Sequence, residues 1–219
     1  MSTALKCAKF FIRHGMDERR DTFDGNMKLQ KMLLFADLIS MAQYDHPLFD
    51  DNICAFANGC VVESVRLRYK NDFAGLLKDS VEFDPDFTQE EYDSLNLSME
   101  IFGHLSAREL SNLNHTFHFW EKYFDASEQP NGYRSKLESI IPKSALKEES
   151  ARIAEIIEIY QQDKNEPVIK ETVNGVDFYC DPETVVVDDA LMDVLFNFSL
   201  SADENAYRVY SEDGNLVIY

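Results

Sequence analysis

The chain has 219 residues, of which 45% are hydrophobic, so it can bury a sizeable core without a disulfide or metal staple. Its 40 acidic and 21 basic residues give a net charge of −19 at pH 7, a surface that repels phosphate backbones and disfavours direct binding of nucleic acid. No apolar run reaches the roughly 18 residues of a membrane span. The N-terminal segment is interrupted by Lys6, Lys9 and Arg13, unlike a secretion signal. We expect a cytoplasmic protein with no membrane segment.

The first part of the sequence is patterned for helices. Capping boxes at Thr88 with Glu91 and at Ser106 with Glu109 predict helices that begin near 89 and 107. Apolar spacing and cap residues predict further elements: a helix over 3–14 that ends at Gly15, a helix over 26–44 capped by Asn26, a short extended piece over 53–56, a turn at Asn58-Gly59, a helix over 61–69, and an amphipathic helix from Ser144 to about Tyr160. The helix over 26–44 is apolar on two faces, which predicts that it is the central buried one.

From residue 166 the periodicity changes from helical to alternating. Segments 168–173 and 176–180 flank Asn174-Gly175, and a second hairpin over 207–219 turns at Asp213-Gly214. A short helix is expected over 188–198. We therefore predict an α+β protein: a mainly helical domain over 1–145, a connecting amphipathic helix over 146–164, and a small acidic α+β extension over 165–219.

The negative charge is concentrated in that C-terminal extension. Residues 165–219 carry 12 acidic residues against Lys170 and Arg208, a net charge of −10, which is about half of the total. Basic proteins are the natural partners of such a surface.

Motifs for catalysis are absent from the sequence. It has no phosphate loop, dinucleotide fingerprint or nucleophile elbow, and its 8 glycines do not cluster. His115 and His118 share a helical face, with His104 and Asp125 as further candidate ligands, but a companion metal motif is lacking, so packing is the favoured interpretation. A metal-dependent hydrolase remains a minor alternative. We predict no catalytic residue, cofactor or metal, and reduced cysteines.

Three ordered blocks resemble one known family. These are residues 28–36 (KLQKMLLFA), residues 46–50 (HPLFD) with 55–65 (AFANGCVVESV), and residues 105–120 (LSARELSNLNHTFHFW). Together they resemble the Panacea domain of SocA-like antitoxins, which is also described as phage-associated and GepA-like. The sequence departs from the family pattern at Ala55, Cys60 and Phe119. The residues that carry the resemblance are Lys28, Gln30, Lys31, Gly59, His115 and Trp120.

The resemblance implies an antitoxin that neutralises a cognate toxin by direct contact and, in the SocA case, delivers it to a protease. An acidic antitoxin suits a toxin with a basic active-site surface. Aromatic anchors within a polar rim are typical of interfaces. The candidate contact residues are therefore Phe178, Tyr179, Asp188, Asp189, Tyr207, Tyr210 and Tyr219. The alternative function is a phage-encoded acidic inhibitor that mimics nucleic acid and blocks a nucleic-acid enzyme or defence protein.

Overall fold

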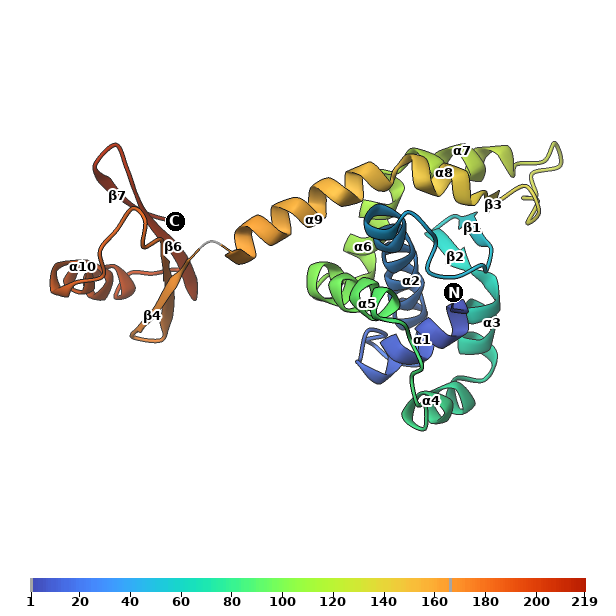
Figure 1. Cartoon of the computed structure of the whole chain (residues 1–219), viewed down its shortest axis with the longest axis horizontal. Helices are drawn as coiled ribbons and strands as arrows, with labels where there is room; N and C mark the ends of the chain where they lie inside the picture. Colours follow the sequence, from blue (N-terminus) through green and yellow to red (C-terminus); the bar gives the residue numbers. More distant parts are fainter. Residues whose placement is uncertain (1, 166) are drawn as a thin grey trace. The chain divides into compact units, whose positions relative to one another are not determined.

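The computed structural model describes residues 2–165 and 167–219. The chain forms two compact units, Met1–Ile157 and Glu158–Tyr219 (Figure 1). The first unit is mainly helical, and the second is a small sheet with one helix. The chain is thus a mixed α+β protein, as predicted. Each unit has its own hydrophobic core.

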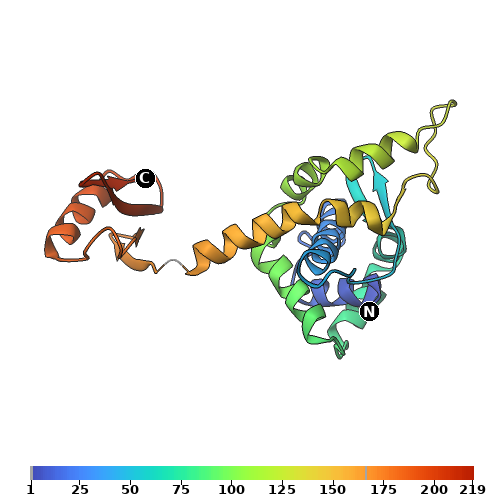
Figure 2. The ribbon, with the colours of Figure 1, turned by 45° about the horizontal axis from the view of Figure 1, so that its top comes forward.

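One helix, α2 (Phe23–Tyr44), is the centre of the first unit. Every residue from 28 to 41 is buried, and Figure 2 shows α2 surrounded by the other helices of the unit. Its neighbours include α1 (Ala4–Arg13), α5 (Gln89–Phe102) and α6 (Ala107–His115). The prediction of a central buried helix is confirmed, whereas its predicted start is wrong: the hydroxyl of Thr22 accepts the N–H of Gly25 and caps the helix four residues before Asn26.

A small sheet lies against α2. It consists of β1 (Ile53–Phe56), β2 (Gly59–Val62) and β3 (Ile140–Ile141) in the order β2-β1-β3. Helix α3 (Glu63–Asn71) follows directly. The helix predicted over 61–69 therefore begins two residues too early. Val61 and Val62 pair instead with Cys54 and Ile53, because β-branched side chains fit a strand better than the first turn of a helix.

The remaining helices of this unit are α4 (Phe73–Val81), α7 (His118–Ala126), α8 (Lys143–Glu148) and α9 (Ser150–Asn165). Both capping boxes are present, at the starts of α5 and α6. The single amphipathic helix predicted from Ser144 is interrupted: Pro142 is the N-cap of α8, and the chain leaves helical geometry at Glu149. The carboxylate of Glu149 accepts the backbone N–H of His118 at 2.7 Å, which ties this break to the start of α7.

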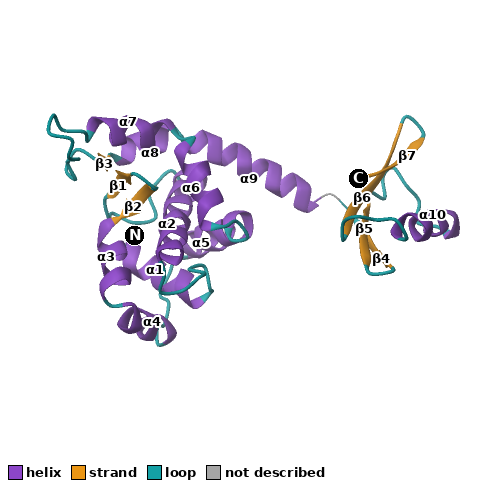
Figure 3. Ribbon diagram, turned by 180° about the vertical axis from the view of Figure 1, so that it is seen from behind, coloured by secondary structure: helices purple, strands orange, loops and turns teal. Residues whose placement is uncertain are grey.

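The second unit is a four-stranded sheet with one helix. It contains β4 (Ile169–Val173), β5 (Val176–Cys180), α10 (Asp189–Ser199), β6 (Ala206–Glu212) and β7 (Asn215–Ile218). The strand order is β4-β5-β6-β7. Both predicted hairpins form, with positive φ at each turn pair, and β5 and β6 join them in parallel. Figure 3 shows α10 on one side of the sheet, and the core of the unit lies between them.

None of the helices within residues 2–165 and 167–219 combines the length and the apolar character that crossing a bilayer requires.

Candidate functional site

The residues of the first sequence block hold the β1–β2 hairpin from the side of α2. The Nζ of Lys31 donates to the backbone carbonyl of Cys60 at 2.9 Å, and the Oε1 of Gln30 accepts the N–H of Val62 at 2.9 Å. Lys31 is fully buried, and burial lowers the pKa of its amine to about 8. These two side chains replace hydrogen bonds that a hairpin in solution would make to water.

The third block holds the same hairpin from the other side. The Oδ1 of Asn114 accepts the N–H of Cys60 at 2.5 Å, and the hydroxyl of Ser111 donates to the carbonyl of Asn58 at 3.0 Å. The indole N–H of Trp120 donates to the carbonyl of Phe56 at 2.9 Å. Side chains from α2, α6 and α7 therefore fix the hairpin backbone along its length, and we call this arrangement the hairpin clamp.

Gly59 is the point where both sides of the hairpin clamp meet. Its φ of +92° lies in the region that favours glycine, and a Cβ there would lie 2.7 Å from the Nζ of Lys31 and closer still to the Oδ1 of Asn114. Only glycine allows the amine and the amide to approach the strand this closely. Lys31 and Gly59 were identified from the sequence, whereas Asn114 and Ser111 were not; their i,i+3 spacing within the third block was the available signal.

Lys28 and His115, the other two residues that carry the family resemblance, pack helices together. The Nζ of Lys28 donates to the carbonyl of Gly103 at 2.7 Å and so closes the C-terminal end of α5. The ring of His115 stacks on Trp120 at 3.9 Å, and burial lowers its pKa. His118 is exposed. Across the residues that the structure describes, no group of three His, Cys, Asp or Glu side chains is placed to hold a metal ion.

A groove of about 500 Å³ lies beside the clamped hairpin. Apolar side chains from three segments line it: Phe23 and Met27 of α2, Phe56 and Val61 of the hairpin, and Tyr69 of α3. Although Phe23 is apolar, it is 67% exposed. Arg66 and Lys70 also line the groove, which therefore joins an apolar floor to basic side chains on a strongly acidic protein.

The loop that forms one rim of the groove is held by a buried pair. The hydroxyl of Tyr69 donates to Asp17 at 3.1 Å and accepts the N–H of Asp21 at 3.0 Å. Asp17 is fully buried, and burial raises the pKa of its carboxyl group although Tyr69 and Arg20 counteract the shift. This pair fixes the loop that leads into Phe23, so the groove is built by tertiary contacts on several sides.

The predicted contact residues of the C-terminal unit divide between the core and the surface. Phe178 and Tyr207 are buried and pack with Phe198, because their positions alternate onto the face covered by α10. Asp188 caps α10 by accepting the N–H of Leu191. The other candidates retain accessible surface: Tyr179, Asp189 and Tyr219 are exposed, and Tyr210 is half-buried with its ring edge-on to Tyr219.

The first unit is thus a helical domain in which one buried helix and the helices around it clamp a small hairpin. Residues 29–121 match the family model described as antitoxin SocA-like, Panacea domain, so the chain carries this domain from α2 into α7. The resemblance read from the sequence is confirmed. Comparisons with curated proteins and with solved structures found no match. The C-terminal unit lies outside the matched region.

Proposed function

We propose that this chain is an antitoxin that neutralises a cognate protein toxin by binding it directly, without catalysis. The match of residues 29–121 to an antitoxin family carries the proposal. The hydrogen bonds made by polar side chains of the matched region support it. Lys31, Gln30 and Asn114 form hydrogen bonds with the backbone of the hairpin and stabilise its conformation. A protein that acts by binding needs such a fixed surface.

Two surfaces are offered as the toxin contact. On the Panacea domain, the groove beside the hairpin presents an apolar floor and the exposed ring of Phe23, which suits a protruding apolar segment of the toxin. On the C-terminal unit, Tyr179 lines a shallow hollow of about 380 Å³, and Tyr210 and Tyr219 supply further accessible aromatic area. Asp188 and Asp189 add negative charge toward a basic toxin.

The product of the neighbouring reading frame provides the test, if it arrests growth when it is expressed alone. We expect co-expression with the wild-type chain to restore growth and the two purified proteins to form a complex. A Phe23→Ser variant weakens the complex at least tenfold if the groove is the contact. Val81→Ser is the matched control, since Val81 is also 67% exposed but does not line the groove, and it leaves affinity unchanged. A toxin that stays active with excess wild-type chain refutes the proposal.

Two further readouts separate related functions. If RNA or DNA displaces the chain from its partner, the acidic nucleic-acid mimic is supported instead. If co-expression shortens the half-life of the toxin, the chain also acts as an adaptor for a protease.

A further inference from the structure

The outer side of α10 combines acidic and apolar side chains. Residues 181–205 include seven acidic residues and no lysine, arginine or histidine. Four large apolar side chains of this region are exposed to solvent: Val186 by 78%, Val194 by 44%, Phe196 by 50% and Leu200 by 69%. Exposed apolar side chains that gather on one small unit are typical of a surface that meets a partner.

The spacing of the exposed residues aligns them along the helix. Asp189, Asp193, Phe196 and the C-cap residue Leu200 are separated by four, three and four residues, which places them on one stripe along α10 and its C-terminal cap. All four are exposed, whereas Leu195 packs into the core on the other side of the helix. The stripe is acidic in its first half and apolar in its second, and we call it the α10 stripe.

The positive charges of the sheet lie on its other face. Lys170 and Arg208 are both in register with Tyr179, whose side chain alternates away from the core residue Phe178. Lys170 is also bound by Asp177 at 2.7 Å. No basic side chain of the sheet therefore alternates toward the face that α10 covers.

We infer that the α10 stripe is a docking surface for a basic protein partner that offers an apolar pocket next to two or more lysine or arginine side chains. This inference rests on the proposed function, in which that partner is the toxin. The net charge of the C-terminal unit determines which kind of partner can occupy the α10 stripe. A second copy of the chain carries −19 and would be repelled by the C-terminal unit, which has 14 acidic and 3 basic residues.

Each half of the stripe has its own part in docking. Phe196 and Leu200 lie one turn apart and can enter the same pocket, where removal of their apolar surface from water supplies affinity. Asp189 and Asp193 pair with the cations of the partner, speed association and fix the direction in which the helix lies. Affinity should then depend on both pairs of side chains, and only the acidic pair should make it sensitive to salt.

Binding to a defined probe tests the stripe directly. The full-length chain is titrated calorimetrically with a synthetic 18-residue amphipathic peptide of leucine and lysine. We expect Phe196→Ser with Leu200→Ser to weaken binding at least tenfold, and Asp189→Asn with Asp193→Asn to weaken it several-fold and flatten its salt dependence. The matched controls, Ile159→Ser with Leu216→Ser and Glu212→Gln with Asp213→Asn, stay within twofold. Equal losses in the controls, or no binding by the wild type, overturn the inference.

Neutralisation of the toxin separates this inference from the proposed function. A wild-type chain that leaves the toxin active refutes the proposed function, and the peptide titration still decides the stripe. If the wild-type chain and the Phe196→Ser, Leu200→Ser variant neutralise the toxin equally well, the inference is overturned and the proposed function stands. Measurements on the free protein test two other occupants of the stripe, a second copy of the chain and another segment of the same chain. A dimer that the Phe196→Ser, Leu200→Ser variant converts to a monomer would reveal the first, and hydrogen-exchange protection of 189–200 that the variant removes would reveal the second. Either result overturns the inference of a basic partner.

Discussion

The Nζ of Lys31 lies 2.9 Å from the backbone carbonyl oxygen of Cys60, and both residues are completely buried. The contact joins the first sequence block to the second, from the middle of the central helix to the hairpin. Within residues 2–165 and 167–219, no ion pair neutralises the amine, and burial lowers its pKa to about 8. The hairpin is thus held by a lysine whose charge is costly at neutral pH.

This cost predicts a pH dependence of stability. The pKa of Lys31 is about 8 in the folded chain and 10.5 in the unfolded chain, so the unfolded state binds more protons between these values and folding stability rises with pH. Relative to Lys31→Met, the wild type should gain about 2 kcal/mol between pH 7 and pH 9.5. Urea unfolding followed by the fluorescence of Trp120, the single tryptophan, measures the difference. A difference that stays constant with pH would show that the buried amine does not titrate in this range.

A second prediction concerns the close approach at Gly59. Gly59→Ala forces a Cβ against Lys31 and Asn114 in addition to the cost of a positive φ. Gly132→Ala is the control, because Gly132 has a φ of +78° and nothing within 4 Å of its Cβ position. We expect the control to lose about 1 kcal/mol and Gly59→Ala to lose about 3 kcal/mol, measured by the same unfolding assay. Equal losses would contradict the steric account of this glycine.

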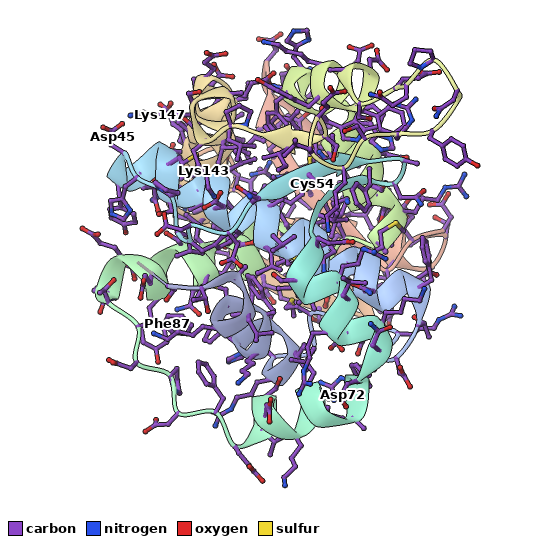
Figure 4. The ribbon with its side chains drawn as sticks, turned by 90° about the vertical axis from the view of Figure 1, so that its right-hand side faces the viewer. Asp45, Cys54, Asp72, Phe87, Lys143 and Lys147 are labelled. Atoms are coloured by element: carbon purple, nitrogen blue, oxygen red, sulfur yellow. The ribbon has the colours of Figure 1, made fainter. Side chains whose placement is uncertain are left out.

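Two lysines of α8 give a third, matched prediction. Lys143 donates to the fully buried Asp37 at 2.8 Å, whereas Lys147 pairs with the exposed Asp45; Figure 4 shows Lys147 and Asp45 at one corner of the unit. Lys143→Met should cost about 2 kcal/mol at pH 7, because it leaves a buried carboxylate without its counter-ion. Lys147→Met should cause little change, since exposed pairs contribute little.

The cost of Lys143→Met should also depend on pH in a defined direction. Burial raises the pKa of Asp37 above 3.8, and Lys143 opposes that shift, so the variant has a still higher folded pKa. Below that pKa the carboxyl group is neutral and needs no counter-ion. The penalty should therefore shrink as the pH falls from 7 toward 4. A penalty that grows on acidification would contradict the assignment of Asp37 as the buried charge.

Local signals in the sequence predicted local structure well. The capping boxes at Thr88 and Ser106 were confirmed, as were the turns at Asn174-Gly175 and Asp213-Gly214. In each case the residues that carry the signal are the ones that make the hydrogen bonds or adopt the required φ. Lys31 and Gly59 were identified in a similar way, because the family blocks require particular residue types at fixed spacings.

Features that depend on contacts between distant segments were not predicted. Val61 and Val62 match a helical pattern and a strand equally well, and only their pairing with β1 decides between the two. The parallel contact of β5 with β6 and the place of Asn114 under Gly59 depend on how separate elements pack. The C-terminal aromatics show the same limit: alternation divides Phe178 from Tyr179, but the sequence does not say which face the helix covers.

Phe178 and Tyr179 therefore provide the last prediction, since these neighbours point to opposite faces of the same strand. Phe178→Ala removes a fully buried ring from a small core and should destabilise the C-terminal unit by about 3 to 4 kcal/mol, seen as faster hydrogen exchange in β5 and β6. Tyr179→Ala should leave this exchange close to that of the wild type, because the side chain is exposed, while it weakens the complex with the toxin. The fluorescence of Trp120 should report unchanged stability of the Panacea domain in both variants, because that residue lies in the other unit. If Tyr179→Ala accelerates exchange as much as Phe178→Ala, the tyrosine supports the fold, and the toxin contact must be sought at the groove or at the α10 stripe.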